Sequence, residues 1–301
     1  MPVTPHSRAP SRRRGQGRQK WLLLFNCQAQ GLANSLSVLC EDVDVEYHDP
    51  VSLQKHLAAI RERASTCDRV VVAPGLVDQL GAELAGRGNV TLVPSPLFFG
   101  YHPDFCDLEA GGRELNPRYG SGYNSVLAYA AFHHGMDESA ALALYREDVY
   151  DALGYFDAWC AARHFFIERY EQFGFDIASR FIAWSRTGAF MHTPNHPKIL
   201  VLRDLAALIL ERLGMDTVQT DAMPHDNLAN GAVLPVYPEI GLRLGVRGSH
   251  LFKRGDAYRF ASLRDFIAES FRMYRACGPI RASTMHAPVV ARATALVAEL
   301  R

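Results

Sequence analysis

The first third of the chain alternates short apolar runs with stretches of helical spacing. The first run is Trp21 to Phe25, and after it leucines and alanines recur every three or four positions. Similar short runs follow at residues 43–47, 69–73 and 90–93. Strands that alternate with helices fold as parallel sheets with right-handed crossovers. Residues 21–96 therefore predict a doubly wound, Rossmann-like sheet, in which ligands bind at the carboxyl ends of the strands.

The α/β rhythm stops at Pro96. Residues 96–122 are rich in Pro, Gly, aromatic and polar residues, and compact proteins usually keep such long irregular stretches for binding or catalysis. We therefore expect an α/β region over 21–122 that ends in a functional loop at 96–122. From 123 to 301 apolar residues recur mainly at helical spacing, which predicts a mainly helical region that packs on the sheet and forms one cleft with it. His164 falls on one such apolar stripe, so we expect it to be buried.

Charge and hydropathy exclude several classes of protein. The chain has 32 basic and 32 acidic side chains, which gives no reason to expect nucleic acid as a partner. Residues 1–20 hold six basic residues and no acid, so we expect a disordered basic arm. The apolar run after it is shorter than the roughly 7 to 15 residues of a secretory signal, and no stretch approaches the length of a membrane span. These patterns predict a cytoplasmic protein without a transmembrane segment.

The six cysteines follow no metal-binding spacing, so we expect reduced thiols and no metal site. One of them, Cys27, lies between Asn26 and Gln28 where the first strand meets the first helix. The amides of a helix start favour negative charge, either a thiolate or a bound anion. The position resembles a nucleophile elbow, although G-x-S-x-G is absent. A small buried cysteine is the alternative, but the two flanking amides favour a functional site.

A second candidate cluster is Asn195-His196-Pro197. Pro197 suits the first turn of a helix and Asn195 can cap it, which would fix His196 at the helix start. The positive end of a helix disfavours an imidazolium, and a neutral imidazole can act as a general base. Simple packing of His196 at a helix start is the alternative interpretation.

A third cluster, His102-Pro103-Asp104, lies in the predicted functional loop. Asp104 could orient the imidazole of His102 or bind a hydroxyl, and a plain Pro-Asp turn is the alternative. Five cations near the candidate loops could hold phosphates, although each alone is more often a solvated surface residue: Arg186, Lys198, Arg247, Lys253 and Arg254. No G-x-G-x-x-G or Walker sequence occurs, which disfavours dinucleotide and P-loop binding.

These clusters, in this order, resemble the WcbI family of capsular polysaccharide biosynthesis enzymes. The resemblance spans roughly residues 21–275 and rests on four motifs: Asn26 to Gln28, His102 to Asp104, Tyr123-Asn124-Ser125 and Asn195 to Pro197. The chain departs from the family pattern at Phe25, where a small residue is frequent, and in its basic amino-terminal arm.

The resemblance implies an α/β protein that binds coenzyme A and transfers an acetyl group from acetyl-CoA to a sugar hydroxyl during surface polysaccharide assembly. Acyl transfer needs a base, donors for an oxyanion and a positive site for phosphates. On this interpretation the catalytic candidates are Cys27, His196, His102 and Asp104. The candidates for binding the coenzyme are Asn26, Gln28, Ser125 and the five cations.

Several alternatives stay open at this point. Direct attack by a sugar hydroxyl, deprotonated by His196, is favoured over a route through an acetylated Cys27, because passing acetyl between two thioesters gains little. A hydrolase with Cys27 or Ser125 as nucleophile would need no coenzyme pocket. A binding module for coenzyme A or a glycan, without turnover, is the third possibility.

Overall fold

The structure, a computed structural model, describes residues 17–255 and 257–301, so most of the predicted arm lies outside the described residues. Its central feature is a parallel sheet of strand order β2-β1-β3-β4. The strands are β1 (Gln19–Leu24), β2 (Val43–His48), β3 (Arg69–Val72) and β4 (Val90–Leu92). The predicted α/β class is therefore confirmed. Strand β1 begins at Gln19, so Lys20 belongs to the sheet rather than to the arm.

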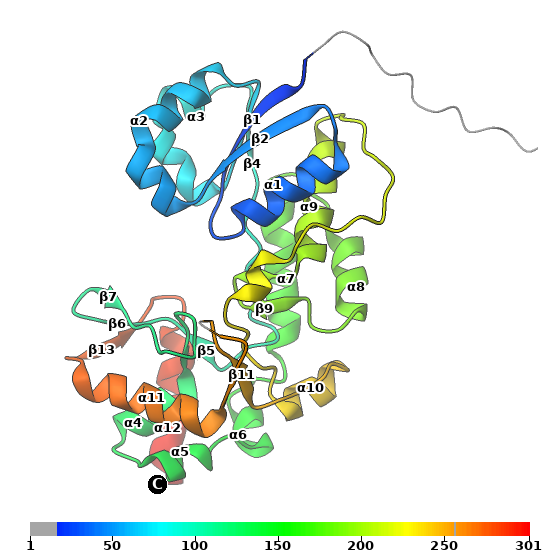
Figure 1. Cartoon of the computed structure of the whole chain (residues 1–301). Helices are drawn as coiled ribbons and strands as arrows, with labels where there is room; N and C mark the ends of the chain where they lie inside the picture. The colour runs from blue at the N-terminus through cyan, green and yellow to red at the C-terminus, as the bar shows by residue number, and fades with distance from the viewer. Residues whose placement is uncertain (1–16, 256) are drawn as a thin grey trace, which may run out of the picture.

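The two faces of β1 enter two different cores because successive side chains of a strand point to opposite faces. Leu23 and Phe25 belong to the large core, together with apolar residues of α1 (Ala29–Leu39). Leu22 and Leu24 belong to a smaller core with residues of α2 (Pro50–Thr66). Figure 1 shows α2 and α3 (Ala82–Ala85) on one side of the sheet and α1 on the other. The sheet is thus doubly wound.

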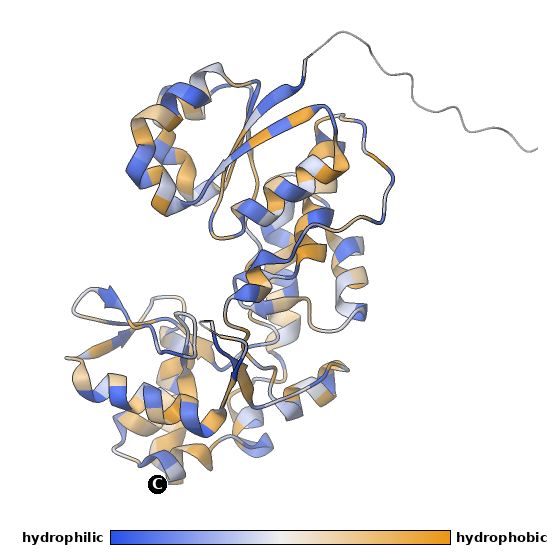
Figure 2. Ribbon diagram, in the orientation of Figure 1, coloured by the Kyte–Doolittle hydropathy of each residue, from blue (hydrophilic) through white to orange (hydrophobic). Residues whose placement is uncertain are grey.

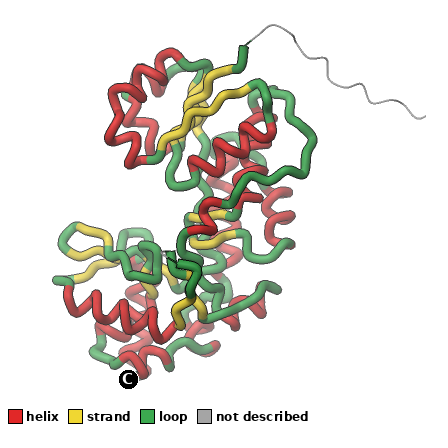
Figure 3. Tube along the Cα trace, viewed as in Figure 1, coloured by secondary structure: helices red, strands yellow, loops and turns green. Residues whose placement is uncertain are grey.

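The remainder of the described chain is mainly helical (Figure 3), as predicted. Its helices are α4 (Val126–His133), α5 (Glu138–Leu142), α6 (Glu147–Ala152), α7 (Ala158–Glu171), α8 (Ala178–Arg186), α9 (Ile199–Arg212), α10 (Pro238–Leu244), α11 (Leu263–Ala276) and α12 (Ala287–Leu300). Short 3₁₀ helices cover Pro74–Leu80 and Asn227–Asn230. The ribbon of α11 carries bands of both hydropathies in Figure 2, and its apolar residues, such as Phe266 and Phe271, are buried.

The segment 96–122 is more ordered than the predicted loop. It holds the short strands β5 (Phe105–Cys106), β6 (Leu108–Ala110) and β7 (Arg113–Glu114). Strand β5 pairs with β8 (Asn124–Ser125), and β6 pairs with β13 (Ile280–Ala282), which lies near the carboxyl end of the chain. Long-range partners, which local patterns do not encode, therefore fix this segment.

Two further hairpins complete the fold. One pairs β9 (Met191–Thr193) with β10 (His196–Pro197), and the other pairs β11 (Leu251–Lys253) with β12 (Phe260–Ser262). Helix α9 follows the first hairpin and packs against α1, so the second half of the chain contacts the sheet half. In the described part of the chain, no helix is both long enough and apolar enough to cross a membrane. The domain boundary at residue 122 and the cleft stay predictions.

The histidine expected in the core is exposed. The side chain of His164 is 77% exposed and pairs with Glu168 across one turn of α7, at 3.1 Å. The expected apolar stripe runs through residues 149–170, but α6 ends at Ala152 and α7 begins at Ala158. Because the turn between them changes the helical phase, His164 faces solvent.

Candidate functional site

The carboxyl end of β1 turns tightly into α1 at Asn26. The Asn26 carbonyl accepts the N–H of Ala29 at 2.9 Å, and its side-chain Oδ1 accepts the N–H of Gln28 at 3.0 Å. Cys27 is exposed at this turn, at the edge where ligands bind in parallel sheets. Phe25, which departs from the family pattern, is fully buried in the large core. The unusual residue is therefore part of the core and does not crowd the exposed turn.

The thiol of Cys27 is held neutral. Although the residue is exposed, neighbouring groups desolvate its thiol and raise its pKa to about 11, and the Asp49 carboxylate also raises it. A backbone hydrogen bond opposes these effects only in part. Desolvation and a nearby negative charge thus outweigh the helix start, whose amides favour a thiolate.

Gln28 joins two of the sequence motifs. Its side chain is fully buried, and its Nε2 donates to the carbonyls of Pro96 at 2.9 Å and Asn195 at 2.7 Å. The structure therefore holds the Cys27 turn beside the segment that carries His196. Since both amide hydrogens are used, Gln28 positions these segments rather than serving an oxyanion. Its Oε1 is buried without a partner among the described residues.

His196 lies in a hairpin and not at a helix start. Its strand β10 pairs with β9, and α9 begins only at Ile199, with Lys198 at the N-cap. The predicted cap by Asn195 is wrong, because its Oδ1 accepts instead from the Thr193 hydroxyl, at 2.9 Å. The Lys198 N–H bonds the Phe190 carbonyl at 2.9 Å, which keeps the residues before Ile199 extended.

The imidazole of His196 is neutral at pH 7. Burial, with a smaller contribution from a positive charge on nearby His192, lowers its pKa to about 4. Its Nδ1 is buried without a partner in the described part of the chain. The neutral base expected from the sequence is therefore present, but desolvation rather than a helix end produces it.

His102 and Asp104 are both buried and point to different partners. The His102 Nε2 lies 3.2 Å from the Leu234 carbonyl, and burial lowers its pKa to about 4. The Asp104 carboxylate accepts from the Tyr155 and Tyr237 hydroxyls at 2.9 and 2.8 Å. Burial raises the pKa of Asp104 to about 6. Asp104 thus anchors a network in the core, and the hydrogen bonds that the structure shows do not join it to the imidazole of His102.

Two side chains near these motifs, His192 and Asp226, belong to no sequence motif. The His192 Nε2 lies 3.0 Å from Asp226 Oδ2, across 34 residues of sequence, so only the fold pairs them. Burial and the charge of Asp107 raise the pKa of Tyr123, and Cys27 raises it further once its thiol ionises. Tyr123, the first residue of the Tyr-Asn-Ser motif, therefore lies within electrostatic reach of Cys27.

Comparison with known families decides the assignment. Residues 20–218 match the family described as polysaccharide biosynthesis enzyme WcbI. The chain belongs to the WcbI family. This confirms the resemblance drawn from the motifs, all four of which lie within the matched residues. No curated protein matches the chain.

A solved structure shares the fold of this WcbI-family chain. It is described as native WcbI, a novel polysaccharide biosynthesis enzyme, without a disulfide bond between coenzyme A and a cysteine. The TM-score is 0.65 at 18% sequence identity, and the match covers 94% of this chain and 96% of the other. At this identity the likeness supports the fold alone, over the part of the chain that the match covers.

Ser125, the other possible nucleophile, is closed off. It is fully buried, its hydroxyl caps α4 by accepting the Ala128 N–H at 3.0 Å, and it lies 2.5 Å from the Tyr145 hydroxyl. It contributes to the core of this WcbI-family fold, which leaves Cys27 as the accessible one of the two proposed nucleophiles.

The five candidate cations are spread over the fold. The Lys253 ammonium donates to the Asn230 and Gly231 carbonyls at 3.0 and 2.6 Å, and Arg254 lies over the ring of Tyr119, 5.8 Å from its centroid. The remaining three lie at the end of α8, at the start of α9 and after α10: Arg186, Lys198 and Arg247. Of these, Lys198 follows the hairpin of His196, and no described residue bonds its ammonium.

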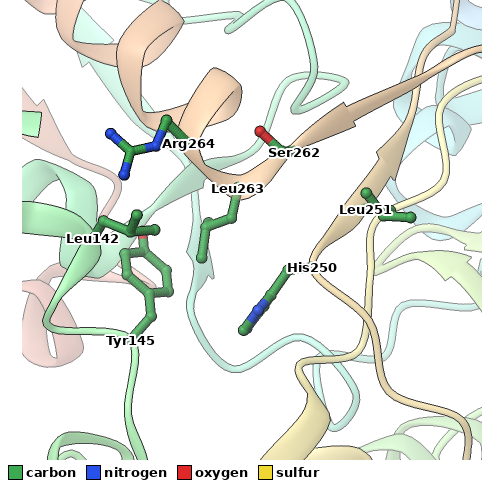
Figure 4. A pocket seen from close by; sticks show the side chains of 7 residues that line it. All are labelled: Leu142, Tyr145, His250, Leu251, Ser262, Leu263 and Arg264. Atoms are coloured by element: carbon green, nitrogen blue, oxygen red, sulfur yellow. The ribbon is translucent and has the colours of Figure 1, made fainter. Parts of the chain in front are cut away.

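One cavity is lined in part by Tyr145, whose hydroxyl lies 2.5 Å from that of Ser125. It has a volume of about 480 Å³, and Figure 4 shows that its lining comes from the end of α5, the start of β11 and the start of α11. Its lining residues are Leu142, Tyr145, His250, Leu251, Ser262, Leu263 and Arg264. Within residues 17–255 and 257–301 no cluster of side chains suits a metal ion.

Proposed function

We propose that this WcbI-family protein binds acetyl-CoA at the Cys27 turn and transfers the acetyl group to a sugar hydroxyl in capsular or other surface polysaccharide biosynthesis. The observation that carries this proposal is the buried Gln28 side chain, which holds the Cys27 turn against the Asn195-His196 segment. The solved relative supports the choice of ligand, because its description names coenzyme A and a cysteine. Cys27 is the exposed cysteine at a strand end in this chain.

The residues at the turn suit a thioester. Gln28 makes no side-chain cap to α1, and the first turn of α1 holds no acidic residue. Asn26 uses the N–H groups of Gln28 and Ala29, so we assign the oxyanion of the thioester carbonyl to the remaining N–H groups of this helix start and to Nδ2 of Asn26. We assign the coenzyme phosphates to Lys198 first, because it directly follows the hairpin of His196.

The neutral His196 imidazole supplies the base. It takes the proton of the acceptor hydroxyl, whose oxygen forms a bond to the thioester carbonyl carbon. As the tetrahedral intermediate collapses, the carbon–sulfur bond breaks and the proton passes from His196 to the leaving thiolate. The products are an acetylated sugar and free coenzyme A. The high pKa of Cys27 favours this direct route, because a neutral thiol is a poor nucleophile.

Titration calorimetry tests the ligand assignment. The proposal expects saturable binding of both coenzyme A and acetyl-CoA, lost when Asn26 and Cys27 are replaced together by Leu and kept in His164→Ala, an exposed control. No heat with either compound would contradict the proposal and favour a hydrolase acting through Cys27. Binding without any acetyl transfer to methyl hexopyranosides would favour the non-catalytic module.

The proposal also includes a cellular location and the binding partners. All six cysteines are free, and free thiols fit the reducing cytoplasm, where we place the protein. The partners are then a coenzyme A thioester and a sugar or glycan acceptor, with no role for nucleic acid.

A further inference from the structure

The hairpin that carries His196 is held in place by one carboxylate. Oδ2 of Asp226 accepts from the His192 ring nitrogen at 3.0 Å and from the Ile199 N–H at 3.1 Å. Its Oδ1 accepts the Ala229 N–H at 3.2 Å. His192 lies in β9 and Ile199 begins α9, so His196 stands between two positions that the same carboxylate holds.

The bond between Asp226 and His192 fixes the tautomer of the histidine. Burial raises the pKa of Asp226, but the hydrogen bonds from His192 and from backbone amides bring its pKa below the ordinary value. An ionised carboxylate only accepts hydrogen bonds, so the Nε2 of His192 carries the proton. His192 is only 8% exposed, whereas the Asp226 side chain is 23% exposed, so the bond is shielded from the His192 side.

His192 is also the electrostatic neighbour of the proposed base. The titratable groups that face it are Asp226, from the segment before the 3₁₀ helix Asn227–Asn230, His196 of β10 and His102 of the segment after β4. A positive charge on His192 disfavours protonation of the other two histidines. A substitution in this pair should therefore change both the position of His196 and its pKa.

We propose that Asp226 and His192 form a positioning pair that fixes the orientation of His196. The expected effect of the pair on kcat rests on the proposed function, whereas its effect on the orientation of the His196 ring does not. Asp226 lies beyond residue 218, where the family match ends. The pair thus adds a residue to the site that the family motifs do not contain.

Nuclear magnetic resonance of the full chain, with ¹⁵N-labelled histidine, tests the pair independently of activity. Asp226→Asn and His192→Gln should each shift the ring resonances of His196 and change its titration midpoint. Asp204→Asn is the matched control, because Asp204 of α9 accepts from the Trp184 indole of α8 at 2.6 Å, and it should leave His196 unchanged. Unchanged His196 resonances in a folded Asp226→Asn or His192→Gln protein would overturn the proposal.

Kinetics supply the second arm. With acetyl-CoA and methyl hexopyranosides, Asp226→Asn should lower kcat by on the order of 10²-fold, the cost of a misplaced group, while KM for acetyl-CoA stays the same. In a His196→Ala background the same substitution should cost less than twofold further. A full additional loss in that background would show a general structural role and contradict the pair. Absence of transfer by the wild type would refute the proposed function alone, since the resonance shifts still decide the pair.

Discussion

At the scale of single residues, the local environments of Cys27 and His196 differ from those that their sequence neighbourhoods suggest. Cys27 follows a strand and precedes a helix, yet its thiol is held neutral by desolvation and by Asp49. His196 follows an asparagine and precedes a proline, yet it lies in a hairpin. The sequence can predict that both residues belong to one site, but their protonation depends on burial, which only the fold determines.

The Cys27 thiol should react slowly with iodoacetamide at pH 7 and faster as the pH rises towards 11, because the thiolate is the reactive form. Exposed Cys160 serves as the internal control in the same peptide map. Cys27→Ser should keep measurable acetyl transfer if the route is direct. Rapid modification of Cys27 at pH 7, faster than that of Cys160, would show that its thiol is activated.

The pH profile of kcat/KM should have its acidic limb near pH 4. The base acts when deprotonated, so activity is full above the pKa of His196, which burial lowers to about 4. Rates measured between pH 4 and 8 should therefore stay flat down to about pH 5. A limb near 6.5, the ordinary value for histidine, would show that His196 is solvated or is not the base.

At the scale of elements, the strands and helices that local sequence patterns encode could be predicted, whereas pairings between residues far apart in the sequence could not. The run Leu22 to Leu24 predicts a buried strand from its own side chains, and Ser262 predicts the start of α11, where it forms a capping box with Asp265. By contrast, β6 acquires its partner β13 from about 170 residues away. The same limit explains why Asp226 could not be connected to His192.

The Gln28 side chain connects the turn after β1 to the β9–β10 hairpin, and its removal should separate these two segments. Gln28→Ala leaves the buried Pro96 carbonyl and the half-buried Asn195 carbonyl unpaired, which should lower the free energy of unfolding by about 1–3 kcal/mol for Pro96 and by less for Asn195, and should reduce acetyl transfer. Gln30→Ala, an exposed position on the same helix, is the control. Denaturant titration and the transfer assay check both effects, and a Gln28→Ala protein with wild-type transfer would refute the link.

At the scale of the whole molecule, buried titratable groups shape stability. Asp104 has a pKa raised by burial to about 6, above its unfolded value. Its contribution is therefore fully present below about pH 4 and is lost as the pH rises through 6. His102 and His196 act in the opposite sense, since their pKa values of about 4 make the fold lose stability as the pH falls below 6.5.

Asp104→Asn isolates one of these contributions. The difference in free energy of unfolding between wild type and variant should shrink by on the order of 3 kcal/mol from pH 4 to pH 7, because two pKa units correspond to this energy. Asp148→Asn, at an exposed pair with Arg146, should show a constant difference. Chemical denaturation at each pH measures both. A constant difference for Asp104→Asn would mean that its carboxyl has an ordinary pKa in the fold.

The central claim is that the Cys27 turn and His196 form one acyl-transfer site. The most direct measurement is the release of free coenzyme A thiol from acetyl-CoA in the presence of methyl hexopyranosides, followed for wild type, His196→Ala and the exposed control His164→Ala. The rate of thiol release should depend on the sugar and should be unchanged in His164→Ala. In His196→Ala this rate should fall by roughly 10²–10⁴-fold, while coenzyme A still binds. Sugar-dependent release that is unchanged in His196→Ala would contradict the central claim.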